Sequence, residues 1–343
     1  MVKHAFYLFL VLLPGLLVGQ IGGRDTYRFL SNTAAARVAA QGSNPIANPE
    51  EDLNFALSNP SLIRPELHGK LAINGVDYVS DILYGNLAYA HHFDSAGTFL
   101  FQTTFMDYGL FERANVIGIR QGTFNVADYA FAVGYGYALD SNWRVGAKLT
   151  YISSAYETYQ SNGMALDLGI HYYLPDKRFM VALTARNLGL QFTPYANTRE
   201  SLPLDLQLGV SHRFEHLPLR MQLTLVDLQR WDLRYDNPTE RQLNQFTGQV
   251  QEDEVPWANN ILRHAIVGLE FAPSDGFNVQ FGYNFRRRQE MNLVTRRTGA
   301  GISFGFGFRL YKFRLNYSRN SYHVAGAANH ISITTDFQSF GGS

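Results

Sequence analysis

Two short patterns in the sequence contain residue types that could perform hydrolysis. Residues 301–305, Gly-Ile-Ser-Phe-Gly, match the G-x-S-x-G pattern of a serine nucleophile, which requires a strand, a sharp turn and then a helix. Here the pattern lies within a predicted strand and no helix follows. His330 and Ser332 share one face of another predicted strand, a pair that some outer-membrane barrel lipases present to the lipid. Ile331 and Ile333 take the lipid side here and turn the pair inward, so we predict no catalytic residues and no enzyme.

The sequence contains no recognisable metal or cofactor site. His91, His92 and the other histidines lack metal-ligand spacing, and the chain has no cysteine. No P-loop occurs, and no dinucleotide fingerprint lies on a βαβ unit. The formal net charge is zero, with 29 basic and 29 acidic residues, which gives no argument for nucleic acid binding. We therefore predict neither metal nor cofactor.

Two predicted loops carry residues suited to binding a partner. Five arginines bracket the loop at about 287–297, opposed only by Glu290, and they are Arg286, Arg287, Arg288, Arg296 and Arg297. They are either the solvated base of a loop or contacts to lipopolysaccharide phosphates or an acidic partner, because arginine binds such groups bidentately.

The loop at about 229–261 is the longest predicted connection. It contains Arg230, Trp231, Tyr235 and Trp257, which are residue types that often anchor interfaces. The alternative is that the two tryptophans belong to an aromatic girdle at the membrane surface. The predicted partner-binding residues are Arg230, Trp231, Tyr235, Trp257, Arg287, Arg288, Arg296 and Arg297.

The elements that must position these residues are strands with one apolar and one polar face. In residues 204–214, Leu204, Leu206, Leu208 and Val210 alternate with polar residues, which is the side-chain period of a strand. About 14 such segments follow His68, at roughly 69–79, 82–93, 97–108, 122–138, 143–154, 163–174, 178–189, 203–214, 217–228, 262–272, 276–286, 298–309, 312–319 and 327–337. The larger, aromatic-rich residues fall on one face and Gly, Ser, Arg and Asn on the other. This pattern predicts a transmembrane antiparallel β-barrel with a polar lumen.

The predicted connections alternate in length. Links after even-numbered strands are short, whereas most links after odd-numbered strands are longer, at about 109–121, 155–162, 190–202, 229–261, 287–297 and 320–326. Outer-membrane barrels have short periplasmic turns and longer extracellular loops. We therefore expect both termini on the periplasmic side, and the last strand to pair with the first because an open edge in lipid leaves backbone groups unpaired.

The N-terminal region precedes this pattern. Residues 1–19 have a short basic start and an apolar run below the roughly 20 residues of a spanning helix, so they read as a signal peptide, with an uncleaved anchor as the alternative. Residues 20–66 are predicted to be either a periplasmic arm or a hatch inside the barrel, with a short helix within 33–42 ended by Gly42. Residues 67–343 form the predicted barrel.

Several segments, in this order, resemble the PorQ family of the type IX secretion system of Bacteroidetes. They are 21–23, 26–30, 36–42, 59–60, 90–94, 122–124 with 128–130, and 229–233 with 235–238. The N-terminal segments also resemble the wider FadL-like group of 14-stranded barrels, which includes PorV. One departure is the tail from Gln338 to Ser343, which leaves the terminal aromatic residue of the barrel as either Phe337 or Phe340.

The resemblance implies an outer-membrane place in the attachment complex with PorU, PorV and PorZ. In that complex PorU is the sortase and PorQ holds PorZ at the surface, so that secreted cargo is processed and attached to lipopolysaccharide. The resemblance supplies no catalytic residues. The alternative function is a FadL-like channel for hydrophobic small molecules, with the N-terminal segment as its hatch.

Overall fold

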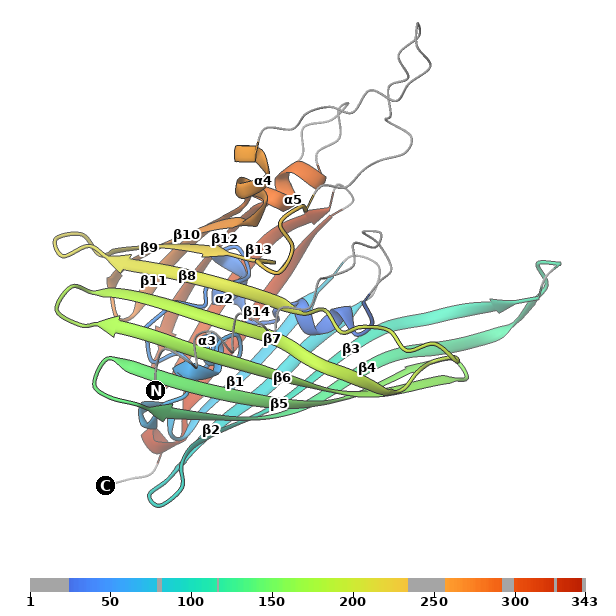
Figure 1. Ribbon diagram of the computed structural model, residues 1–343, viewed down its shortest axis with the longest axis horizontal. Helices are drawn as coiled ribbons and strands as arrows, with labels where there is room; N and C mark the ends of the chain where they lie inside the picture. The colour runs from blue at the N-terminus through green and yellow to red at the C-terminus, as the bar shows by residue number, and fades with distance from the viewer. Residues whose placement is uncertain are drawn as a thin grey trace, which may run out of the picture.

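The protein forms a closed antiparallel barrel of fourteen strands in the computed structural model, which describes residues 25–78, 82–115, 117–233, 257–291, 299–323 and 326–340. Figure 1 shows the strands wrapped around the N-terminal segment. The strands are β1 (Lys70–Asp77), β2 (Leu83–Phe93), β3 (Gly97–Ala114), β4 (Arg120–Ala138), β5 (Trp143–Tyr156), β6 (Tyr159–Leu174), β7 (Phe179–Thr193), β8 (Asp205–Arg213), β9 (Leu219–Leu225), β10 (Ala265–Ser274), β11 (Phe277–Asn284), β12 (Ile302–Leu310), β13 (Phe313–His323) and β14 (Gly326–Asp336). Each strand pairs with its neighbours in sequence, and the predicted closure is confirmed by pairing of β1 with β14 from Lys70↔Asp336 to Asp77↔Asn329.

The two faces of the strands differ as the alternation predicts. On β12, Ile302, Phe304, Phe306 and Phe308 are between 37% and 48% exposed on the outside, whereas Ser303 is 2% exposed and points inward. Outward aromatic side chains also meet across strands, as Phe306 and Tyr317 do at 5.6 Å between ring centroids. An exterior of this kind is stable against lipid rather than water, so the barrel is a membrane-spanning one.

Short helices complete the described chain. They are the 3₁₀ helices η1 (Arg28–Ser31), η2 (Pro60–Leu62), η3 (Pro65–Leu67) and η4 (Phe337–Phe340), and the α-helices α2 (Ala36–Ala40), α3 (Leu53–Ala56), α4 (Trp257–His264) and α5 (Phe285–Glu290). Helix α2 lies within the predicted 33–42 segment, and Gly42 follows it with φ +89°. No helix in these residue ranges is long and apolar enough to cross a membrane.

The two ends of the barrel differ in their connections. Turns of two to five residues join β2–β3, β4–β5, β6–β7, β8–β9, β10–β11 and β12–β13 at what we call the short-turn end. The opposite, long-loop end carries the β7–β8, β9–β10 and β11–β12 connections. Three predicted long links at this end are wrong. Strands β5 and β6 continue to a tight turn after Tyr156, and β13 and β14 continue to His323 and Gly326.

The third correction is the predicted loop at 109–121. Strands β3 and β4 continue through most of it and form a hairpin that projects beyond the other strands at the long-loop end (Figure 1). Gly109, Gly118 and Gly122 lie in or next to this stretch, and all three have positive φ. Strand pairing shifts register near Gly109 and Gly122, so these glycines accompany β-bulges rather than ending the strands.

Candidate functional site: the filled lumen and the long-loop end

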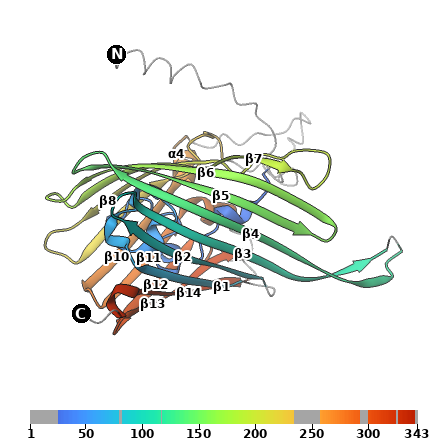
Figure 2. The same cartoon turned by 90° about the horizontal axis from the view of Figure 1, so that it is seen from below.

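The described N-terminal residues, 25–69, occupy the lumen. Helix α2 packs against β11–β14, and η2 packs against β4–β6. Both views show the blue N-terminal segment within the ring of strands (Figures 1 and 2). The segment starts at the long-loop end, where Thr26 N donates to Ser201 O at 2.9 Å. It reaches β1 at the short-turn end, where Phe337 N donates to Gly69 O at 2.9 Å. Residues 1–24, including the predicted signal peptide, lie outside the described residues.

Inward-facing strand positions are shaped to receive this segment. A Cβ atom at Gly146 would overlap the carbonyl oxygen of Pro60, and one at Gly136 would overlap that of Ile63. Because glycine has no side chain, the backbone of the N-terminal segment can pack directly against the strands at Gly136 and Gly146. Phe55 and Ile63 are 0% exposed in the same interior.

Residues that the sequence offered for hydrolysis hold the segment in place. Ser332 Oγ accepts a hydrogen bond from Ala36 N at 2.7 Å, and Ser303 Oγ donates to Ala40 O at 3.0 Å. His330 is 0% exposed and its Nε2 lies 3.4 Å from the hydroxyl oxygen of Tyr322. The predicted inward orientation of His330 and Ser332 is therefore confirmed. Ser303 is the second residue of β12, and the strand continues after it to Leu310 rather than turning into a helix, so the G-x-S-x-G pattern lacks the strand-to-helix turn that the nucleophile needs.

A buried network of charges links the segment to strands β9 and β10. Arg37 is 1% exposed, and its guanidinium lies 2.7 Å from Glu270 Oε1 and 3.0 Å from Asp52 Oδ2, and also contacts Glu50. Arg220 Nη1 lies 3.0 Å from Glu50 Oε1. Buried charges are costly unless they are paired, so these contacts fix the position of the segment.

The network changes the proton affinity of the groups on the N-terminal segment. Burial raises the pKa of Glu50, but the positive charges of Arg37 and Arg220 outweigh burial and lower that pKa to about 2. Burial lowers the pKa of Arg37, but Glu270, Glu50 and Asp52 outweigh it and raise that pKa well above its ordinary value. Glu50 and Arg37 are therefore both ionised at neutral pH.

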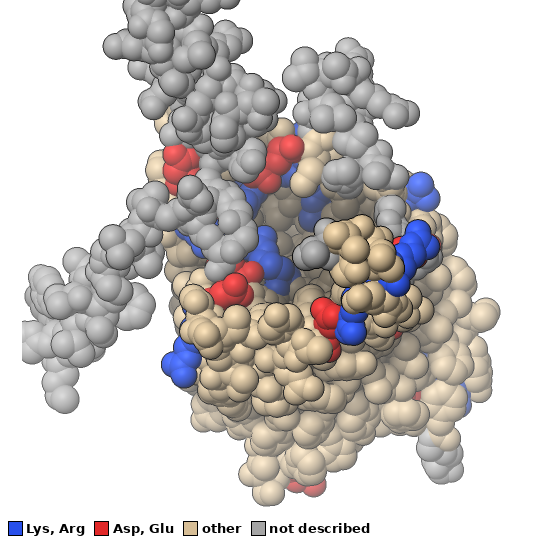
Figure 3. Space-filling model, turned by 90° about the vertical axis from the view of Figure 1, so that its right-hand side faces the viewer, with Lys and Arg blue, Asp and Glu red and all other residues tan. Residues whose placement is uncertain are grey.

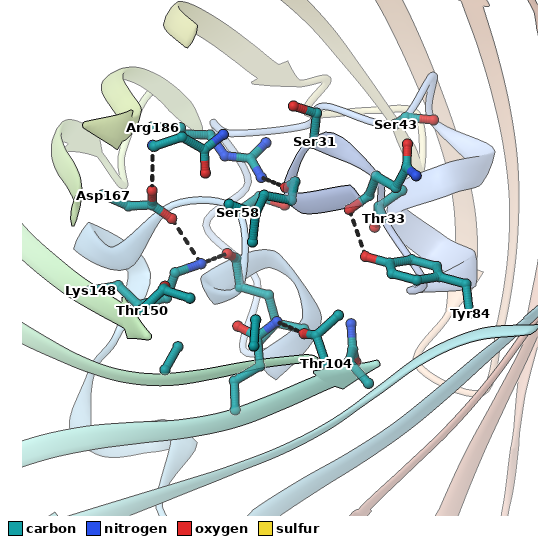
Figure 4. Close-up of a pocket in the computed structure, with 18 residues that line it drawn as sticks. Ser31, Thr33, Ser43, Ser58, Tyr84, Thr104, Lys148, Thr150, Asp167 and Arg186 are labelled. Carbon is teal, nitrogen blue, oxygen red and sulfur yellow. Dashed lines mark hydrogen bonds and ion pairs between the residues drawn. The ribbon is translucent and has the colours of Figure 1, made fainter. Parts of the chain in front are cut away.

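A second polar contact lies on strands β5 and β6. Lys148 Nζ lies 2.9 Å from Asp167 Oδ2 and donates to Leu57 O at 2.7 Å. Next to it is a cavity of about 50 Å³, drawn in Figure 4 with Lys148, Asp167 and Arg186 around it. Its lining is mainly polar and includes Ser31, Thr33, Ser58, Asn86, Gln102, Thr104, Thr150 and Asn187. A space of this size holds about one or two waters.

The structure places part of the predicted arginine cluster at the long-loop end. Arg286 Nη1 lies 2.7 Å from Asp227 Oδ2, and its Nε lies 2.8 Å from Glu290 Oε1. The guanidinium of Arg287 lies 4.2 Å from the centroid of the Tyr322 ring. Arg288 is in the same helix, α5. Arg296 and Arg297 lie outside the described residues.

The predicted aromatic anchors lie beside helix α4. Trp231 is 65% exposed, and its ring stacks on His264 at 6.1 Å between centroids. Trp257 is the first residue of α4 and is 73% exposed. Arg230 Nη2 lies 3.7 Å from Asp25 Oδ2. Tyr235 lies outside the described residues. Figure 3, which looks at this end, shows acidic and basic side chains around a hollow.

Sequence reasoning missed the charged network inside the barrel. The alternation of inward and outward positions along the strands places Arg220 and Glu270 on inward faces. Charged residues at inward positions indicate that oppositely charged partners lie inside the barrel. The alternation does not identify Arg37, which comes from the N-terminal segment. No group of three or more His, Asp or Glu side chains within the described ranges is arranged to hold a metal ion.

No protein-family model and no curated protein matches this sequence. Among solved structures, the toluene transporter TbuX of Ralstonia pickettii is similar, with 10% identity, coverage of 90% of this chain and 99% of that chain, and a TM-score of 0.49. The toluene transporter TodX of Pseudomonas putida has 12% identity, coverage of 88% and 96%, and a TM-score of 0.49. A FadL homologue of Pseudomonas aeruginosa has 10% identity, coverage of 90% and 98%, and a TM-score of 0.45. Similarity at this level carries no argument about what this chain binds.

Proposed function

We propose that this protein is an outer-membrane scaffold whose long-loop end docks a component of the type IX secretion attachment complex. The partner suggested by the resemblance to PorQ is PorZ, acting with PorU and PorV, so that secreted cargo is processed and attached to lipopolysaccharide. The observation that carries the proposal is the filled lumen. Residues 25–69 occupy it, and the cavity beside Lys148 and Asp167 is only about 50 Å³.

The character of this cavity supports a scaffold over a channel for apolar molecules. Small-molecule sites usually have volumes of about 300–1,000 Å³ and mainly apolar walls. This cavity is smaller and is lined by Lys148, Asp167, Arg186 and several hydroxyl and amide side chains. The apolar side chains of the segment, such as Phe55 and Ile63, are already packed at 0% exposure.

The second candidate is a FadL-like channel for hydrophobic small molecules. It is favoured by the contacts of the N-terminal segment with the wall, which include ion pairs to Glu270 and Arg220. These pairs are not covalent, so the segment can leave the wall as a hatch while it stays joined to β1. Transport then requires this segment to leave the wall, because residues 25–69 occupy the lumen between β4–β6 and β11–β14.

The binding residues within this proposal are those predicted at the long-loop end. Trp231 and Trp257 offer exposed aromatic surface, whereas Arg286 and Arg287 already contact Asp227, Glu290 and Tyr322. Direct phosphate binding by the arginines would have to compete with these contacts. Changing Arg286, Arg287, Arg288, Arg296 and Arg297 to Gln tests this, since lipopolysaccharide or partner contact at low salt should then weaken.

The experiment that separates the two functions is a deletion strain complemented with the full chain. A scaffold predicts that surface attachment of secreted cargo is lost on deletion and restored by complementation, with uptake of an apolar compound such as toluene unchanged. A channel predicts the reverse. Cargo attachment that persists in the deletion strain would refute the scaffold. A pull-down with intact loops that recovers no secretion-system protein would also count against it.

A further inference from the structure

Strand β7 places a buried arginine in the lumen without a carboxylate in contact with it. Arg186 is 8% exposed. Its Nη1 donates to Asn44 Oδ1 and its Nη2 donates to Leu30 O, both at 3.3 Å. A guanidinium carries five N–H groups, so these two long hydrogen bonds leave most of its donors unused. Among the residues that the structure describes, no carboxylate oxygen lies within ion-pair distance of this guanidinium.

The carboxylates on the neighbouring strands bind other groups. Asp205 lies directly opposite Arg186 in the pairing of β7 with β8, but its carboxylate accepts a hydrogen bond from Asp227 N at 2.8 Å. The carboxylate of Asp167 on β6 lies 2.9 Å from Lys148 Nζ. A buried charge is costly unless an opposite charge and hydrogen bonds compensate it. Arg186 therefore lacks a negative charge at contact distance.

The cavity of about 50 Å³ inside the barrel lies against this guanidinium. The charged residues in its lining are Arg186, Lys148 and Asp167, which are two cations and one carboxylate. Figure 4 shows the three side chains along one wall of the space, on the consecutive strands β7, β6 and β5. The lining thus carries one excess positive charge around a space for one or two waters.

Donor groups suitable for an anion surround this space. Lys148 Nζ has three N–H groups, and its contacts with Asp167 and with Leu57 O use two of them. Ser58 and Thr150 also line the cavity and are 5% and 6% exposed. Within the described part of the chain, their hydroxyl groups form no hydrogen bond. The cavity can therefore donate several hydrogen bonds to a negative ion.

The cavity can be reached from solution. Ser31 and Asn32 belong to its lining, and both residues are exposed. They follow closely on Thr26, which contacts Ser201 at the long-loop end. An ion can therefore enter beside η1 without displacement of the N-terminal segment.

We propose that this cavity binds one small monovalent anion of the size of chloride. The anion neutralises Arg186 and accepts hydrogen bonds from Lys148, Ser58 and Thr150. Water can accept the same hydrogen bonds, but it leaves the charge of Arg186 uncompensated. Because Ser58 belongs to the N-terminal segment and both cations belong to the wall, the anion joins the two. This site goes beyond the proposed function, since it would be the same in a scaffold and in a channel.

Crystals of the full-length protein grown in sodium bromide test the site directly. Bromide substitutes for chloride in protein sites, and its anomalous scattering locates it. We expect an anomalous peak between Arg186 and Lys148 in the wild-type protein and none there in Arg186→Met. A wild-type crystal without this peak, or an equal peak in the variant, would overturn the proposal.

A titration measures the same site in detergent solution. The protein is transferred from sodium gluconate, whose anion is too large for the cavity, to sodium chloride at constant ionic strength. The temperature of unfolding should rise with chloride and reach a plateau, because the ion binds the folded state. Amides in residues 25–69 should also gain protection from hydrogen exchange, since the anion joins this segment to the wall.

Variants distinguish this site from a general effect of salt. Arg186→Met should weaken the apparent chloride affinity by about tenfold or more, because it removes the charge and its hydrogen bonds. The matched control is Arg213→Met, at an exposed position, which should keep the wild-type affinity. Thr150→Val changes the side-chain volume little and removes one donor, so it should also weaken chloride binding even if Arg186→Met fails to fold.

Three results of the titration would contradict the proposal. They are a wild-type protein whose unfolding temperature does not depend on chloride, an equal dependence in Thr150→Val and Arg186→Met as in the wild type, and a plateau reached with less phosphate than chloride. The last result would mean that the site accepts a larger anion. Loss of chloride binding with cargo attachment retained would leave the scaffold function unaffected.

Discussion

The guanidinium of Arg37 lies 2.7 Å from the carboxylate of Glu270, which joins the N-terminal segment to strand β10 inside the barrel. The two residues are 233 positions apart in sequence, and their side chains are 1% and 2% exposed. Both belong to a network with Glu50, Asp52 and Arg220 that includes three carboxylates and two guanidiniums. The position of the segment in the lumen thus depends on charges from distant parts of the chain.

Replacement of Arg37 by Met should weaken the barrel by about 3–5 kcal/mol, because it leaves Glu270 and Asp52 buried without their partner. The measurement is the free energy of unfolding in detergent, followed by the shift between folded and unfolded bands on a gel. Arg213→Met, at an exposed position, is the control and should change stability little. The double variant Arg37→Met with Glu270→Gln should lose less than the sum of the two single losses; strict additivity would contradict a direct interaction.

Replacement of Gly146 by Ala should displace η2 from the wall, because the new Cβ would overlap the Pro60 carbonyl oxygen. Overpacking of this kind costs about 1–3 kcal/mol. Hydrogen exchange and protease cleavage within residues 25–69 should both increase. Gly75→Ala is the matched control, since a Cβ there meets no atom within 4 Å. Equal protection of the segment in both variants would show that the Pro60 contact does not position it.

Acidification should weaken the barrel between about pH 4.5 and pH 2. The pKa of Glu50 falls from its usual 4.5 to about 2 in the folded protein, where the attraction of Arg37 and Arg220 outweighs burial. A lowered pKa contributes stability that is complete above the unfolded value and is lost as pH falls toward the folded value. Glu50→Gln should flatten the stability profile in this window, whereas the exposed control Glu215→Gln should not. Identical profiles for both variants would rule out Glu50 as the source.

An arginine on the outer face should hinder insertion into lipid. Phe306 lies near the middle of β12 and faces outward with 41% exposure. An arginine at the bilayer midplane costs about 2–4 kcal/mol in a membrane barrel and near 0–1 at the interface. Phe306→Arg should therefore reduce folding into lipid vesicles, whereas Tyr311→Arg, in the β12–β13 turn, should have little effect. Equal folding of the two variants would mean that Phe306 does not contact lipid.

Much of the fold could be predicted because its signal is local. Alternation with a period of two is visible in a single strand, as at Phe304, Phe306 and Phe308, and it repeats through the chain. The number of strands, the inward and outward faces of each strand and the closure of the barrel could therefore be predicted. Connection length was less predictable. Gly109 and Gly122 are compatible with a loop or with bulges in a long hairpin, and only the pairing of β3 with β4 distinguishes the two.

The sequence by itself determined a two-faced, strand-forming chain that must close on itself, because unpaired backbone groups are too costly in lipid. Only the tertiary structure decided what fills the cylinder. Whether Arg37 meets Glu270, and whether Pro60 approaches Gly146, depends on how the N-terminal segment crosses the lumen. The path of the N-terminal segment is decided by packing and charge pairing among residues far apart in the chain. Neither interaction produces a periodic pattern in the sequence.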